Sequence, residues 1–111
     1  MPAFELSTSA FELVVGQLEA SMERARWPEQ AGFAQVPQLS RDAEGALRSA
    51  VPAQGSYRVT CDRLCAQRLA EWFERMEAVI ERTRTDYDDP RRLATVCAEA
   101  VSTIRSACPQ N

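Results

Sequence analysis

The strongest hydrophobic pattern in the chain lies between residues 62 and 84. Apolar side chains recur there every three or four residues, which is the spacing of one face of an α-helix. The members of this face are Cys65, Leu69, Trp72, Phe73, Met76, Val79, Ile80 and Thr83. Charged residues fill most of the other positions, and Asp62 stands before the pattern as an N-cap. The segment is therefore predicted to be a long amphipathic helix.

A second helical pattern begins at Pro90 and ends before Pro109. Asp89 is a typical N-cap residue, and proline suits the first position of a helix. The inward positions of this helix are Leu93, Val96, Cys97, Ala100, Val101, Ile104 and Cys108. Because a loop of only about four residues separates it from the preceding helix, the two helices are predicted to form an antiparallel hairpin.

The first half of the chain carries two further helical patterns. Ser9 and Glu12 have the spacing of a capping box. The stripe that follows consists of Phe11, Val14, Val15, Leu18, Met22 and Ala25. Another helix is expected from Pro37 to Pro52, after a loop in which Phe33 folds back onto the core. The predicted fold is thus mainly α, with four helices arranged as two antiparallel helical hairpins.

Two short segments with alternating apolar residues, AFELS and SYRVT, each precede a pair of predicted helices. They lie 53 residues apart, which is the spacing expected for a tandem strand-helix-helix duplication of residues 4–52 and 57–108. In that interpretation the fold is α+β, and the two strands pair as a short antiparallel ribbon that places Glu5 near Arg58. In the alternative interpretation, the same segments are only extended lead-ins to the helices.

The length and composition are typical of one compact globular domain over residues 1–111. The chain has 111 residues, of which 45% are hydrophobic and 26% are charged, so it can bury a core without obligatory disulfides or metals. Its apolar runs are too short to span a membrane, and its first residues have no basic region of a secretory signal. We therefore expect a cytoplasmic protein.

Several catalytic groups are missing from the sequence. It contains no His, and all 13 of its basic residues are Arg. This excludes a Ser-His-Asp or Cys-His nucleophile, an imidazole metal ligand, a lysine Schiff base and the lysine of a phosphate-binding loop. The four glycines are isolated, so no glycine-rich loop is present. We expect a protein that is not an enzyme and binds no cofactor.

The four cysteines are the one candidate reactive cluster. Their spacing matches no common zinc pattern, and Cys97 and Cys108 lie roughly 16 Å apart along one predicted helix. Cys65 and Cys108 are expected at nearly the same height of the C-terminal hairpin, so a disulfide could join them. The leading interpretation is that all four cysteines are buried free thiols. Cys61 is the candidate reactive thiol, because the helix start and Arg63 are expected to lower its pKa.

The leading hypothesis is a small acidic module that binds another protein, as an adaptor, an inhibitor or an immunity-type neutraliser of a toxin. Its net charge of −3 adds no attraction for phosphate, so nucleic acid is an unlikely partner. The candidate partner-binding residues are Arg68, Glu71, Glu74, Arg75 and Arg82 on the long helix and Phe33 in the loop. Trp72 and Phe73 make the apolar stripe broad enough to pack on two neighbours. In a monomer both neighbours are other helices of the chain, and in a homodimer one of them belongs to a second copy.

Two alternative functions belong to other classes. The order strand, helix, helix resembles that of the ribbon-helix-helix repressors, which implies a DNA-binding regulator. The resemblance covers element order alone, because the long helix exceeds the short first helix of that family and Glu5 and Arg58 mix charges at outward strand positions. The other alternative is a thiol redox protein that uses Cys61, with Cys65 as its resolving partner.

Overall fold

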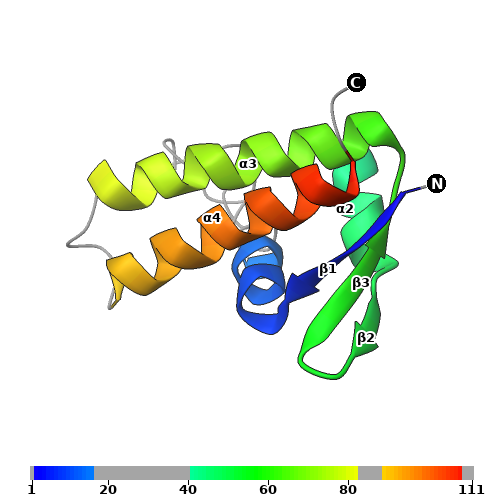
Figure 1. Cartoon of the computed structure of the whole chain (residues 1–111), viewed down its shortest axis with the longest axis horizontal. Helices are drawn as coiled ribbons and strands as arrows, with labels where there is room; N and C mark the ends of the chain where they lie inside the picture. Colours follow the sequence, from blue (N-terminus) through cyan, green and yellow to red (C-terminus); the bar gives the residue numbers. More distant parts are fainter. Residues whose placement is uncertain (1, 17–40, 83–88, 109–111) are drawn as a thin grey trace, which may run out of the picture.

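A computed structural model of the chain describes residues 2–16, 41–82 and 89–108. The described part is an α+β fold in which helices pack against one face of a small antiparallel sheet (Figure 1). The elements in chain order are β1 (Ala3–Ser7), a helix over residues 8–16, α2 (Arg41–Arg48), β2 (Val51–Ala53), β3 (Ser56–Thr60), α3 (Arg63–Arg82) and α4 (Pro90–Ala107).

The sheet has three strands in the order β1-β3-β2, and both strand pairs are antiparallel. Glu5 of β1 lies opposite Arg58 of β3, so the register expected from the two alternating segments is confirmed. The expected ribbon of two strands is wrong in one respect, because Val51–Ala53 adds a third strand on the other side of β3. The duplication itself stays a prediction.

The third strand replaces the end of a predicted helix. Helix α2 ends at Arg48, whereas its pattern predicted a helix up to Pro52. Proline disfavours the helical conformation in the residue before it, so Val51 is extended. Pro52 then lies opposite Tyr57 in β2. A short turn with Gly55 at φ 72° returns the chain into β3.

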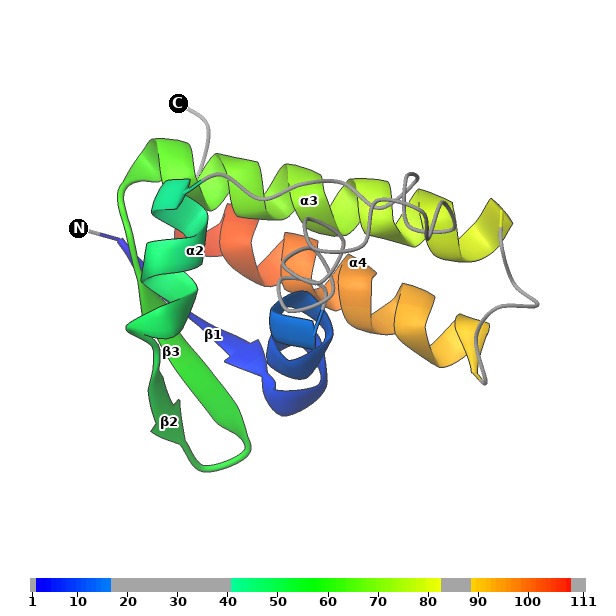
Figure 2. The ribbon, with the colours of Figure 1, turned by 180° about the vertical axis from the view of Figure 1, so that it is seen from behind.

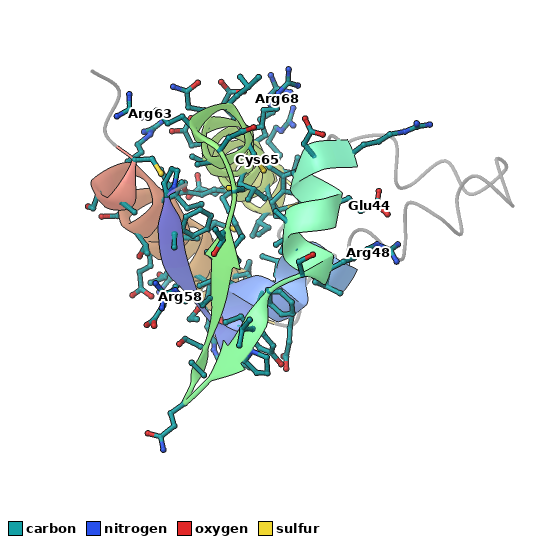
Figure 3. All side chains as sticks on the ribbon, turned by 90° about the vertical axis from the view of Figure 1, so that its right-hand side faces the viewer. Glu44, Arg48, Arg58, Arg63, Cys65 and Arg68 are labelled. Carbon is teal, nitrogen blue, oxygen red and sulfur yellow. The ribbon has the colours of Figure 1, made fainter. Side chains whose placement is uncertain are left out.

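One face of the sheet is apolar and the other is polar, because successive side chains of a strand point to opposite faces. Phe4, Leu6 and Val59 point inward and are buried, whereas Glu5 and Arg58 point outward and are exposed. Figure 3 looks onto this outer face, with α4 on the side of β1 and α2 on the side of β2. Helix α4 contacts β1, and α2 contacts β3, so the core lies between the sheet and the helices.

Helices α3 and α4 lie side by side and run antiparallel (Figures 1 and 2). Their inward residues join one core cluster, in which Phe73, Met76 and Ile80 are fully buried. Trp72 packs edge-on against Phe73, with ring centroids 5.0 Å apart. Both rings are buried within the single chain, and the homodimer stays a prediction.

Side-chain caps set where the helices begin. An Asp62 Oδ1 oxygen accepts a hydrogen bond from the backbone N–H of Cys65 at 2.8 Å, and Asp89 accepts one from Arg92 at 3.2 Å. Both predicted N-caps are therefore confirmed. The capping box at Ser9 is wrong, because the first helix begins at residue 8. Its cap is Ser7, the last residue of β1, whose Oγ accepts from the N–H of Ala10 at 3.2 Å.

Several predictions for the first half of the chain fall outside the described residues. These are the later part of the first helical stripe, the helix start at Pro37 and the loop that contains Phe33. The N-terminal hairpin consequently stays a prediction. No helix in the described part of the chain is long and apolar enough to cross a lipid bilayer.

Candidate functional site

The outward face of α3 carries five of the predicted partner-binding residues. Arg68, Glu71, Glu74, Arg75 and Arg82 are all exposed. They cover about 21 Å along the helix axis, since each residue adds about 1.5 Å. In Figure 3, Arg68 points away from the body of the molecule, whereas Cys65 of the same helix points into it. The sixth predicted residue, Phe33, lies outside the described residues.

One of these residues also contacts the neighbouring helix. The carboxylate of Glu74 forms an ion pair with the guanidinium of Arg105 on α4. Their side chains are 42% and 49% exposed, so solvent screens the pair. The charged surface of α3 therefore continues onto α4 and is not confined to one helix.

A groove between the two helices lies next to this surface. It has a volume of about 580 Å³ and opens between the C-terminal half of α3 and the outer side of α4. Its lining residues are Glu77, Ile80, Glu81, Pro90, Arg91, Ala94, Thr95, Ala98, Glu99 and Ser102. We refer to this feature as the α3–α4 groove.

The shape of the α3–α4 groove follows from side-chain size. Ala94, Ala98 and Ser102 follow one another at intervals of four residues, so they lie along one side of α4. These short side chains leave room that longer ones would fill. Ile80 of α3 also borders the groove and is itself fully buried.

The charged groups of the groove are mostly acidic. Glu77, Glu81 and Glu99 contribute three carboxylates, and Arg91 contributes one guanidinium. Glu77 is half-buried, and its charge is the second cause, after burial, that raises the pKa of Cys97. An apolar lining with an acidic excess suits a basic group attached to an apolar one.

Sequence reasoning missed this groove. The spacing of small residues along α4 is visible in the sequence, but Ala94, Ala98 and Ser102 are not among the predicted inward positions of that helix. Only the position of α3 brings Glu77 and Glu81 next to it. The available signal was the combination of Ala94 and Ala98 with Glu99 on one side of an amphipathic helix.

The cysteines are buried and are free thiols. Cys61, Cys65 and Cys108 are 3%, 2% and 6% exposed, and Cys97 is fully buried. No Cys65–Cys108 bond is formed in the structure. Cys65 lies at the start of α3, and Cys108 directly follows the end of α4. The disulfide between them stays a prediction.

The expected activation of Cys61 is wrong in direction. Burial is the main cause that raises its pKa to about 12, and a hydrogen bond with the Cys65 thiol contributes to the same rise. The sequence placed Cys61 at a helix start beside Arg63, but its backbone N–H also donates to the carbonyl of Pro2 at 3.2 Å. This contact extends the β1–β3 ladder and carries the cysteine into the core. The helix start and Arg63 do not offset the loss of solvation.

The acidic and thiol groups do not assemble into a metal centre. Across residues 2–16, 41–82 and 89–108, no group of three or more His, Cys, Asp or Glu side chains is arranged to hold a metal ion. The outward strand positions considered for DNA contact are all exposed, and Glu5 lies directly opposite Arg58 there. One negative and one positive charge thus lie side by side on this face.

Comparison of the chain with models of protein families, with curated proteins and with solved structures found no match.

Proposed function

We propose that this chain is a small acidic module that binds another protein and catalyses no reaction. Its binding surface consists of the α3–α4 groove together with the outward charged face of α3. An adaptor, an inhibitor and an immunity-type neutraliser of a toxin all act in this way, and a cytoplasmic location is part of the proposal.

The observation that carries the proposal is the chemistry of the α3–α4 groove. Three carboxylates and one guanidinium surround a lining that includes Ile80 and two alanines, in a volume of about 580 Å³. That volume lies within the range of roughly 300–1,000 Å³ that ligand pockets occupy. It accepts a few side chains of a partner, and the apolar lining gives them a surface to bury.

The charge of the groove indicates the kind of partner segment. A basic side chain would meet Glu77, Glu81 or Glu99, whereas an acidic one would be repelled by them. An apolar side chain beside the basic one would pack against Ala94 and Ala98. We therefore propose a partner whose contacting segment carries at least one Arg or Lys next to an apolar residue.

Fewer observations support the two alternative functions, a DNA-binding regulator and a thiol redox protein. A DNA-binding regulator would need basic groups directed at phosphate, but the net charge is −3 and Glu5 offsets Arg58 on the outward face of the sheet. A thiol redox protein would need an accessible thiolate, but Cys61 is buried and its pKa is raised to about 12.

The test compares two arginine substitutions on α4. Ala98→Arg places a large cation in the groove, whereas Thr103→Arg adds the same charge at an exposed position that does not line the groove. Each purified variant is immobilised and used to capture proteins from the native host. We expect the wild type and Thr103→Arg to retain the same stoichiometric partner. Ala98→Arg should retain at least about tenfold less, which corresponds to about 1.4 kcal/mol of binding free energy.

Two results would contradict the proposal. One is the absence of any stoichiometric protein partner in the wild-type sample, and the other is equal retention of a partner by both variants. Circular dichroism and thermal unfolding of each variant show whether the fold is retained before capture is compared.

A further inference from the structure

The two sides of the α3–α4 groove differ in charge and in side-chain size. Glu77 and Glu81 are one helical turn apart on α3, so both carboxylates lie on the same side of the groove. The small side chains of Ala94, Ala98 and Ser102 follow the α4 side over about 12 Å, which is about two turns. A row of two carboxylates therefore runs beside a row of small side chains.

The small side chains of the groove face solvent. The C-terminal end of α3 and the N-terminal end of α4 lie furthest from the sheet (Figure 1). The lining residues that the structure describes all belong to these two helices. Ala94 is half-buried, whereas Ala98 and Ser102 are exposed. Another chain can thus reach this row of α4 without displacing the core.

The backbone of both helices is already hydrogen-bonded along the groove. Residues 94–102 lie away from both ends of α4, so their N–H and C=O groups bond within that helix. The N–H groups of residues 77–81 bond within α3 in the same way. The Thr95 hydroxyl donates to the carbonyl of Arg91 at 3.0 Å. These stretches of the two helices therefore leave no backbone N–H for the carbonyls of a bound peptide.

This lack of backbone donors distinguishes a helical occupant from an extended one. An extended segment packed into the groove would bury carbonyl groups that find no amide partner there, which is unfavourable. A helix makes its backbone hydrogen bonds internally and binds a groove through side chains alone. Short side chains on α4 also let a second helix approach to about 8–10 Å, the usual distance between the axes of packed helices.

We propose that the α3–α4 groove takes an amphipathic helix of the partner protein, with two basic side chains one turn apart that face Glu77 and Glu81. This inference rests on the proposed function and names the form of the partner segment. Residues four apart on any helix are separated by about 6 Å along its axis. Two basic residues on a helix that lies alongside α3 therefore match the spacing of the two carboxylates, while its apolar residues pack on Ala94 and Ala98.

The charge of the groove selects the sign of the partner helix. Among the described lining residues, three carboxylates face one guanidinium. The single opposing charge, Arg91, lies in the first turn of α4, at one end of the groove. A helix with acidic side chains in place of the basic ones would consequently be repelled by Glu77 and Glu81.

The test uses three synthetic peptides as probes for the full chain. The first is an amphipathic helix of about 18 residues, above the length at which isolated helices are marginal, with two lysines four residues apart beside a stripe of alanine and leucine. The second has a proline between the lysines, which breaks the helix and keeps the charges. The third has glutamate in place of both lysines. Binding is measured by NMR titration of the wild-type chain.

We expect the lysine helix to bind with a dissociation constant below about 1 mM and to shift the amide signal of Ala98 more than that of Thr103. The proline and glutamate peptides should bind at least about tenfold more weakly. No binding of the lysine helix, or shifts that avoid the groove, would overturn the proposal.

Equal binding of the lysine helix and the proline peptide would also overturn the helical form, but it would leave the proposed function standing. The proposed function fails on a different result, which is the loss of any stoichiometric partner in capture from the host. The two failures are therefore distinguishable, and the peptide series does not depend on the folding of a variant.

Charge reversal of the two carboxylates tests the same contact from the side of this chain. Glu77→Lys combined with Glu81→Lys should weaken binding of the lysine helix by at least about tenfold. Glu5→Lys combined with Glu12→Lys is the matched control, because it changes the net charge equally at exposed positions that do not line the groove. Circular dichroism checks the fold of both variants. Equal losses in the two variants would show that the peptide responds to net charge alone, which contradicts the proposal.

Discussion

Glu74 of α3 and Arg105 of α4 form an ion pair that joins the outer surfaces of two antiparallel helices. Both side chains are substantially exposed, so the pair connects the charged face of α3 to α4 without being part of the core. It stands beside the α3–α4 groove and contributes to the same mixed surface.

This ion pair is expected to contribute little to stability. A double-mutant cycle with Glu74→Gln and Arg105→Gln should give a coupling energy of about 0.2–1 kcal/mol, as exposed pairs usually do. The free energy of unfolding is measured by urea titration at low salt and again at about 1 M salt, where screening should remove most of the coupling. A coupling well above that range would show that the pair is shielded from solvent.

Two glycines are expected to respond to alanine in opposite directions. Gly55 has a φ of 72°, a backbone conformation that costs alanine about 1–2 kcal/mol. Gly45 lies within α2, and no atom lies within 4 Å of an added Cβ. Gly45→Ala should therefore stabilise the fold by about 0.5–1 kcal/mol, whereas Gly55→Ala should destabilise it. Thermal unfolding of both variants checks the signs, and a stabilising Gly55→Ala would contradict the turn geometry.

Substitutions at one buried and one exposed position of α3 test which face of the helix packs into the core. Phe73 is fully buried, and Leu64 is 55% exposed. Phe73→Ala should lower the free energy of unfolding by about 3–5 kcal/mol, whereas Leu64→Ala should change it by less than about 0.5 kcal/mol. Urea titrations measure both values. Similar losses at the two positions would mean that α3 buries a different face.

The buried thiols predict a loss of stability in alkaline solution. Cys61 and Cys97 have a pKa of about 12 in the folded chain, against 9.0 for an unperturbed thiol. Between these two values the unfolded chain releases protons that the folded chain retains, so the free energy of unfolding falls as the pH rises. The stabilisation is complete below about pH 9. Urea titrations between about pH 8 and pH 11 measure this slope, and Cys97→Ala should make it shallower.

The same thiols should react slowly at neutral pH. Iodoacetamide attacks the thiolate, and burial suppresses both ionisation and access. Mass spectrometry should detect little alkylation of the folded chain under conditions that modify all four cysteines in urea. Rapid modification of Cys61 alone would restore the hypothesis of a reactive thiol.

Local signals in the sequence predicted the elements that local interactions determine. The long helix over residues 63–82 follows from its apolar spacing, and the caps at Asp62 and Asp89 follow from residue type. The pairing of Glu5 with Arg58 also follows, because two alternating segments with buried faces have few registers that keep both faces inward.

Features that depend on spatial neighbours were not predicted. Strand β2 has only three residues and no alternation, so Pro52 indicated the end of a helix and not an edge strand. The pKa of Cys61 was predicted in the wrong direction because its burial accompanies a contact with Pro2, which is distant in the sequence. The α3–α4 groove likewise exists only because Ala98 of one helix and Glu81 of the other line the same space.

The most direct test of the binding surface is site-specific photo-crosslinking in the native host. A photoreactive amino acid is placed at Thr95, which lines the α3–α4 groove, and separately at Thr103, an exposed position of the same helix outside it. We predict a discrete crosslinked adduct with one protein from position 95 and none from position 103. No adduct from position 95, or the same adduct with equal yield from both positions, would contradict a partner bound in the groove.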